Sequence, residues 1–99
     1  MAVDKTIVQV RPNTGVSWYD STDEIKAYIQ TNYRDTGKIT NSTVSVSSDG
    51  LTRTSTTTYN NADSVTEFLD DDTVRNGLVI ARRDHNRDNN ITITPRDQM

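Results

Sequence analysis

The sequence predicts an α+β domain in which strands and helices follow one another in the order βαββαβ. Three observations support this fold class: a β-branched run near the N-terminus, an amphipathic segment that opens with a capping sequence, and an Asp-Gly pair between two polar strands. With 99 residues, the chain has room for one two-layer core. We therefore expect residues 1–99 to form a single domain.

The first strand and the first helix have the clearest signals. Thr6–Arg11 is rich in β-branched residues and precedes Pro12 and an Asn-Thr-Gly turn sequence, so a strand is expected there. The run Ser-Thr-Asp-Glu that begins at Ser21 has the spacing of a capping box, with Ser21 as the N-cap. The helix behind it should end at Gly37. Its apolar stripe consists of Ile25, Tyr28, Ile29 and Tyr33.

Two polar strands, Thr40–Ser47 and Thr52–Tyr59, are expected to form a hairpin around Asp49 and Gly50. Asp-Gly is a preferred pair for a two-residue type I′ turn, which would place Val44 opposite Ser55. One face of the hairpin then carries Val44, Val46, Leu51 and Tyr59. The opposite face carries only hydroxyl side chains, from Thr43, Ser45, Ser47, Thr52, Thr54, Thr56 and Thr58. A slip of one residue would mix the two faces, so this separation supports the register.

The second half of the chain predicts a helix in two parts and a short last strand. Asn60 or Asn61 is expected to cap a short helix that carries Ala62, Val65, Phe68 and Leu69. The run Asp70-Asp71-Asp72 should break this helix and cap the next one, which carries Val74, Leu78, Ala81 and His85. Ile91–Thr94 is expected to form the last strand and Pro95 to end it. The resulting order is that of the ferredoxin-like split βαβ fold, whose antiparallel sheet has both helices on one face and leaves the other open.

Composition excludes several classes of function. The chain has no cysteine, which excludes disulfides, thiolate metal sites and cysteine nucleophiles. Its net charge of −3 disfavours nonspecific binding to nucleic acid or to anionic membranes. The longest apolar run, Leu78–Ala81, is far too short to span a bilayer, and the N-terminus shows no signal-peptide or transit-peptide pattern. We expect a soluble intracellular protein without a nucleic-acid or membrane partner.

Two acidic motifs resemble metal sites, but each has a simpler structural explanation. Asp84, Asn86 and Asp88 fit positions 1, 3 and 5 of a calcium loop, yet Asn89 replaces the glycine at position 6 and Pro95 replaces the glutamate at position 12. The segment is better explained as a polar helix end with Asn89 or Asn90 as its C-cap. Asp70-Asp71-Asp72 is better explained by helix capping. We therefore expect no metal and no cofactor.

Three aromatic or titratable residues are candidates for a pocket between the sheet and the helices: Trp18, Tyr28 and His85. His85 is the only histidine, and no Ser/His/Asp arrangement accompanies it, so a half-buried structural role is expected rather than catalysis. Trp18 precedes the first helix, where an apolar side chain commonly staples the first turn. No catalytic residue is predicted.

The hydroxyl side of the hairpin is the most unusual surface in the sequence. It has three interpretations: a solvated sheet face built from residues of high β-propensity, an ice-binding array, and a hydrogen-bonded contact in an oligomer. Two twisted strands are a weak template for ice. If the surface is a contact, its residues are Thr43, Ser45, Thr52, Thr54, Thr56 and Thr58, and its first candidate partner is a second copy.

The segment from Leu51 to Ile93 resembles the second half of a dimeric α/β-barrel domain of the antibiotic-monooxygenase-like superfamily. The shared order is a strand, a short helix, an acidic break before Val74, a second helix and a final strand. The resemblance implies a homodimer whose open sheet faces pack together. This chain departs from the pattern because it has serine and threonine where that barrel is usually apolar, and no catalytic residue carries over.

The whole chain also resembles small proteins encoded by marine tailed phages, notably those that infect cyanobacteria. Three motifs carry the likeness: Val-Gln-Val-Arg-Pro-Asn-Thr from Val8, Ser-Ser-Asp-Gly-Leu-Thr from Ser47, and Ala-Arg-Arg-Asp from Ala81 followed by Asn-Ile-Thr from Asn90. It implies a protein located in the virion or in the host cytoplasm.

The expected function is therefore that of a non-enzymatic phage protein, a small structural, assembly or protein-interaction module of the virion. The alternative is a small-molecule-binding protein or cofactor-free enzyme of the dimeric α/β-barrel type. A third hypothesis, an inhibitor that masks a host protein, is not separated from the first by the sequence.

Overall fold

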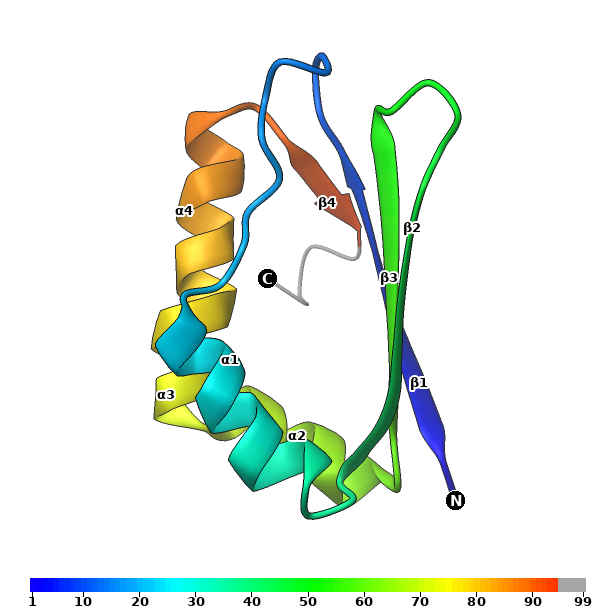
Figure 1. The fold of residues 1–99 in the computed structure, drawn as a ribbon, viewed down its shortest axis with the longest axis vertical. Helices are drawn as coiled ribbons and strands as arrows, with labels where there is room; N and C mark the ends of the chain where they lie inside the picture. Colours follow the sequence, from blue (N-terminus) through cyan, green and yellow to red (C-terminus); the bar gives the residue numbers. More distant parts are fainter. Residues whose placement is uncertain (95–99) are drawn as a thin grey trace.

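The computed structural model describes residues 1–94 and consists of a helical layer packed on one face of a sheet (Figure 1). The strands are β1 (Val3–Val10), β2 (Ile39–Val46), β3 (Thr52–Tyr59) and β4 (Thr92–Thr94). They form one antiparallel four-stranded sheet in the order β2-β3-β1-β4. This confirms the predicted α+β class, and the strand order is compatible with the ferredoxin-like fold. Pro95, expected to end the last strand, lies outside the described residues.

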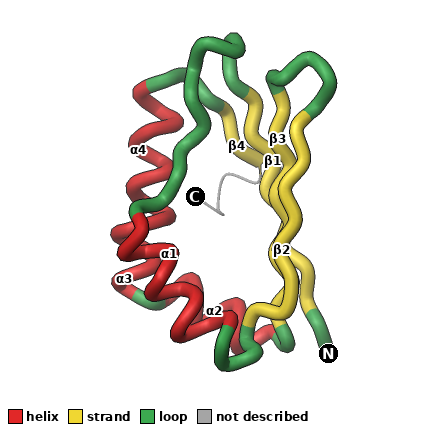
Figure 2. Tube along the Cα trace, viewed as in Figure 1, coloured by secondary structure: helices red, strands yellow, loops and turns green. Residues whose placement is uncertain are grey.

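The helices form three segments. α1 (Asp23–Ile29) continues into the wider turns of η1 (Gln30–Arg34), and α2 (Ala62–Asp70) follows the hairpin. The third segment joins α3 (Asp72–Val74), η2 (Arg75–Ile80) and α4 (Ala81–Asp88) without interruption. All three lie on the same side of the sheet, so its other face is uncovered by helices (Figure 2). None of the helices in residues 1–94 is long and apolar enough to cross a membrane.

Local sequence chemistry explains where these helices begin and end. The N-cap of α1 is Thr22, whose hydroxyl accepts a hydrogen bond from the Ile25 amide at 3.4 Å; the prediction of Ser21 was wrong by one residue. Gly37, with φ of +80°, follows the end of η1 as predicted. Asn61 caps α2. Asp71 both ends α2 and caps α3, which confirms the predicted break.

The β2–β3 hairpin has the predicted register but a different turn. Val44 pairs with Ser55, as expected. The Ser47 amide donates to the Thr52 carbonyl at 2.8 Å, so the loop comprises the four residues 48–51 rather than two. Of these residues only Gly50 has positive φ, at +76°. A type I′ turn needs positive φ at both central residues, so that prediction was wrong.

The core lies between the inner face of the sheet and the helices. Its buried cluster is Tyr33, Ile39, Tyr59, Val65, Phe68 and Val74. The Phe68 ring meets the rings of Tyr33 and Tyr59 edge-on, with centroids 4.9 and 5.7 Å away. Val44 and Val46 share the side of the sheet that carries Tyr59, as predicted, but β2 is an edge strand and they remain 58% and 49% exposed.

Strand β1 presents its residues in an unexpected direction. Because Val3 pairs with the buried Tyr59, the odd-numbered residues of β1 face the helices and the even-numbered ones face outward. Gln9 is therefore buried, and the Asn86 side-chain amide of α4 donates a hydrogen bond to its Oε1 at 3.0 Å. This amide pair is a polar tie between the sheet and the helical layer.

Candidate functional site

The uncovered side of the sheet, which we call the outer face, contains all the predicted contact residues. Thr43, Ser45, Thr52, Thr54, Thr56 and Thr58 alternate outward along β2 and β3. Register places further outward residues beside them on β1, β2 and β4: Asp4, Thr6, Val8, Val10, Asn41, Thr92 and Thr94. The surface is thus twice as large as the hairpin alone suggested.

Charge is nearly absent from the outer face. Among the described strand residues that face outward, Asp4 is the only charged one, although charged residues make up 25% of the chain. Two valines of β1 also lie on it: Val8 between Thr54 and Thr94, and Val10 at the end of the strand, where it is 41% exposed. Depletion of charge together with exposed apolar side chains is typical of a protein contact rather than of a solvated sheet.

Some hydroxyl groups on the outer face form hydrogen bonds with neighbouring side chains of the same face. The Oγ1 atoms of Thr6 and Thr56 lie 3.0 Å apart across β1 and β3, and Thr58 Oγ1 donates to Asp4 Oδ1 at 2.7 Å. A hydroxyl that already has a protein partner loses less when water is removed. The outer face is therefore better suited to desolvation than its polar composition indicates.

The three predicted pocket residues are not brought together. Trp18 is half-buried beneath the guanidinium of Arg11, which lies 4.7 Å from its ring centroid. His85 Nε2 lies 2.7 Å from the Ser17 carbonyl, and its ring packs at 5.8 Å against Tyr19. His85 thus holds the loop between β1 and α1 against α4, and the Trp18 ring also lies 6.0 Å from the guanidinium of Arg53 on β3. Only Tyr28 lines a substantial hollow, at the other end of the helical layer.

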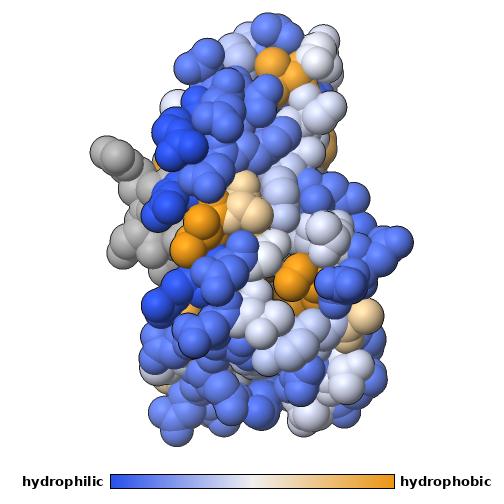
Figure 3. Space-filling model, turned by 90° about the vertical axis from the view of Figure 1, so that its left-hand side faces the viewer, coloured by the Kyte–Doolittle hydropathy of each residue, from blue (hydrophilic) through white to orange (hydrophobic). Residues whose placement is uncertain are grey.

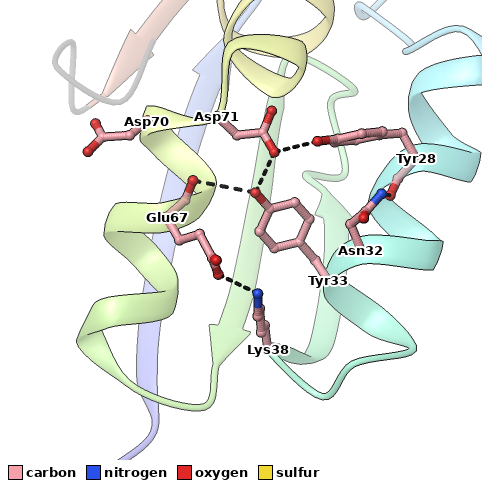
Figure 4. Close-up of a pocket in the computed structure, with 7 residues that line it drawn as sticks. All are labelled: Tyr28, Asn32, Tyr33, Lys38, Glu67, Asp70 and Asp71. Atoms are coloured by element: carbon pink, nitrogen blue, oxygen red, sulfur yellow. Dashed lines mark hydrogen bonds and ion pairs between the residues drawn. The ribbon is translucent and has the colours of Figure 1, made fainter.

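This hollow has a volume of about 360 Å³ and lies between η1 and the α2–α3 junction (Figure 4). Tyr28 Oη and Tyr33 Oη both donate to Asp71 Oδ2, at 2.7 and 2.6 Å. Lys38 Nζ pairs with Glu67 Oε2 at 2.6 Å. The sequence identified Tyr28 and the cap at Asp71 separately, but nothing in the spacing indicated that they meet.

Asp71 is held as a carboxylate. Burial opposes its ionisation, but the hydroxyls of Tyr33 and Tyr28 and the amides of Val74 and Thr73 outweigh burial and lower its pKa below the usual value. The pKa of Tyr33 is raised, first by burial and then by its bond to Asp71. The pKa of Tyr28 is raised chiefly by its hydrogen bond to the same carboxylate. At neutral pH both tyrosines are therefore protonated donors.

These contacts leave the hollow little chemistry to perform. A carboxylate offers about four lone-pair sites, and Asp71 uses two for the tyrosine hydroxyls and two for the amides of Thr73 and Val74, at 2.9 and 3.3 Å. It has no acceptor to spare for a substrate proton. We interpret the cluster as an anchor that joins the first helix to the start of α3.

The residues that fit the calcium-loop pattern do not form a loop in the structure. Asp84, Asn86 and Asp88 lie in the helix α4, where Asn86 is buried against Gln9 and Asp84 pairs with Arg83 and Arg87. The capping explanation is supported instead, because Asn89 is the C-cap and Asn90 has φ of +58°. Within residues 1–94, no group of three or more acidic or histidine side chains is placed to hold a metal ion.

No protein-family model matches the chain, and no curated protein and no solved structure is significantly similar to it. The functional argument therefore rests on the geometry of the outer face and of the interior.

Proposed function

We propose that this protein is a non-enzymatic interaction module that self-associates through its outer face. The observation that carries the proposal is that, among residues 1–94, the sheet face without helices has a single charged side chain and carries two valines. A solvated face would more often carry lysine or glutamate. Two copies related by a two-fold axis would place the same neutral surface on each side of the contact.

The size of the outer face bears on how stable this association is. Three strands of eight residues form a patch about 26 Å long and about 14 Å wide, and the three residues of β4 add little, for about 400 Å² in all. Two such patches bury about 800 Å² in total, which is in the range of weak, transient contacts. We therefore expect a dimer that forms and dissociates with protein concentration.

Light-scattering chromatography at several concentrations tests this proposal. The wild type is expected to shift from monomer to dimer mass as its concentration rises, and the Thr54→Lys/Thr56→Lys double variant is expected to stay monomeric, because it places two charges in the middle of the contact. The matched control is Thr31→Lys/Thr66→Lys, which adds the same charge on exposed helix positions. A wild type that is monomeric throughout, or a dimer unaffected by the first pair of lysines, contradicts the proposal.

We further propose that the module is ferredoxin-like and belongs to a tailed phage, as a component of the virion or of its assembly. The strand order and the one-sided helices support the fold, and the sequence likeness to small marine phage proteins supports the source. Mass spectrometry of purified particles tests the second part. Recovery of the chain at constant stoichiometry with the capsid would support a virion role; its restriction to the lysate would exclude one and favour an intracellular role.

The second candidate function is that of a small-molecule-binding protein of the dimeric α/β-barrel type. The hollow beside Tyr28 is large enough for a small ligand, which favours this candidate, but the charged groups that line the hollow already have partners. The Val8 and Val10 positions favour the dimer that both hypotheses share. Ligand-induced thermal stabilisation in a panel of aromatic compounds, lost on Tyr28→Phe, would bring this candidate forward.

A further inference from the structure

The hollow between η1 and the α2–α3 junction carries more negative charge than its anchor role requires. Its volume of about 360 Å³ is near the lower end of the range for small-ligand pockets. Among the described residues that line it are three carboxylates, of Glu67, Asp70 and Asp71, and one ammonium, of Lys38, so these side chains have a net charge of −2. The hollow therefore attracts cations.

Both tyrosine hydroxyls of the hollow have already committed their hydrogen atoms. Tyr28 Oη and Tyr33 Oη donate to Asp71 Oδ2 at 2.7 and 2.6 Å, so each retains only lone pairs for a further partner. Asn32 Nδ2 donates to the carbonyl of Tyr28 at 2.9 Å, whereas its Oδ1 accepts no hydrogen bond from residues 1–94. The hollow thus offers a ligand mostly acceptors, and a ligand that fits must supply donors.

Lys38 shows how the hollow holds a cation. Its Nζ pairs with Glu67 Oε2 at 2.6 Å and lies 5.7 Å from the centroid of the Tyr33 ring, so one ammonium already lies beside a carboxylate and an aromatic ring (Figure 4). The Tyr28 ring has no such cation among the described residues. A second aromatic ring is therefore left for a cation that comes from outside.

We propose that this hollow binds a small organic dication with N–H donors, of the alkyldiamine class. Two ammonium groups match the net charge of −2, and their N–H groups match the acceptors of Tyr28, Asn32 and Glu67. The methylene chain between them packs along the tyrosine rings, as the stem of a lysine side chain does on apolar surface. A metal ion fits less well, because no three acidic side chains in residues 1–94 are placed to hold one.

Nuclear magnetic resonance titration of the full chain with 1,4-diaminobutane, at constant ionic strength, tests the inference. The amides of Tyr28, Asn32 and Lys38 are expected to shift in a saturable manner. Succinate, which has the same number of carbon atoms and the opposite charge, should leave them unchanged. The quaternary analogue, in which methyl groups replace every N–H, should bind more weakly because it cannot donate hydrogen bonds.

Two substitutions should change the affinity for 1,4-diaminobutane in opposite directions. Glu67→Gln removes one negative charge and should raise the dissociation constant about threefold, as for a partly exposed ion pair. Lys38→Met removes the competing ammonium and should lower the dissociation constant by a similar factor. The matched controls are Asp88→Asn and Lys26→Met, which remove the same charges from exposed ion pairs on other helices.

Four results would overturn the inference. They are shifts that do not saturate, equal shifts with sodium chloride, a quaternary analogue that binds as tightly as the diamine, and changes of affinity in the same direction for Glu67→Gln and Lys38→Met. Effects of the control substitutions as large as those in the hollow would also contradict it, because they would reflect only the charge of the whole chain. If a variant fails to fold, the comparison of the three ligands on the wild type still decides.

The inference is independent of the proposed self-association. The described residues that line the hollow belong to the helices and to the turn before β2, and none lies on the outer face. A negative titration therefore leaves the dimer standing, and a strictly monomeric chain leaves the diamine site standing.

Discussion

At the residue scale, the side chain of Asp71 accepts four hydrogen bonds. It caps α3 through the amides of Thr73 and Val74 and accepts hydrogen bonds from the hydroxyls of Tyr28 and Tyr33. These bonds join three separate stretches of chain. Stability should therefore depend on this carboxylate.

Replacing Asp71 by alanine is expected to lower the free energy of unfolding by about 2–3 kcal/mol at neutral pH, the combined loss of a cap and of charged hydrogen bonds. Urea denaturation measures the change. Asp72→Ala is the control, because Asp72 lies in the same helical turn but is exposed. Equal effects of the two substitutions would contradict the anchor role.

The same site predicts a pH dependence. The pKa of Asp71 is lower in the folded chain than in the unfolded chain, so its contribution is complete above the unfolded value of about 3.9 and is lost as the pH falls through the folded value. The stability difference between wild type and Asp71→Ala should accordingly shrink below about pH 4. A difference that stays constant to lower pH would show that the carboxylate charge contributes nothing.

Burial of polar side chains between the layers gives a third prediction at this scale. Asn86→Ala leaves Gln9 Oε1 without its donor at a buried position and should cost about 1–3 kcal/mol in unfolding free energy. The double variant Gln9→Leu/Asn86→Leu removes both polar groups and should recover much of this loss. If the double variant is as unstable as the two single changes added together, the pair is not coupled as described.

At the element scale, η2 and α1 approach each other closely at Gly77 and Ile25. A Cβ built on Gly77 would lie 2.1 Å from Ile25 Cδ1, closer than any real contact. Gly77→Ala should therefore destabilise the fold by about 1–3 kcal/mol through overpacking, despite the gain of about 1 kcal/mol in helix propensity. Calorimetry on Gly77→Ala, Ile25→Ala and the double variant checks this prediction. Ile25→Ala should rescue the glycine substitution, and a simple sum of the two effects would contradict the contact.

The elements differ in how far the sequence predicted them. The hairpin register followed from the separation of hydroxyl and apolar side chains, which only one alignment preserves. Which residues of β1 face inward could not be predicted in this way, because valines such as Val8 and Val10 would ordinarily face a core. Their outward position depends on pairing with β3 and on the partner that Asn86 provides for Gln9, and neither is visible locally.

The candidate sites show the same division. The six hydroxyl residues of the hairpin were predicted correctly as one surface, because alternation along a strand is a local property. Trp18, Tyr28 and His85 were not gathered into a pocket, because their positions depend on how the loop before α1 crosses the helices. The small cavity beside Lys5, between the sheet and the helices, was not predicted, since a lysine in a strand ordinarily indicates a solvent-exposed position.

At the scale of the whole molecule, the two sides differ in character. The outward surface of the helical layer is mostly hydrophilic, with apolar side chains only in small separate patches (Figure 3). In residues 1–94, the outer face of the sheet carries one charged side chain, Asp4, together with exposed valine. This contrast favours association through the sheet and leaves the helices in solvent.

The measurement that tests this central claim most directly is a filtered nuclear Overhauser experiment on mixed labelled and unlabelled chains at high concentration. We predict contacts between chains at the methyl groups of Val8, Thr54 and Thr56. Contacts confined to the edge strand β2, at Val44 and Val46, or contacts from the helices, would place the interface elsewhere and contradict the account.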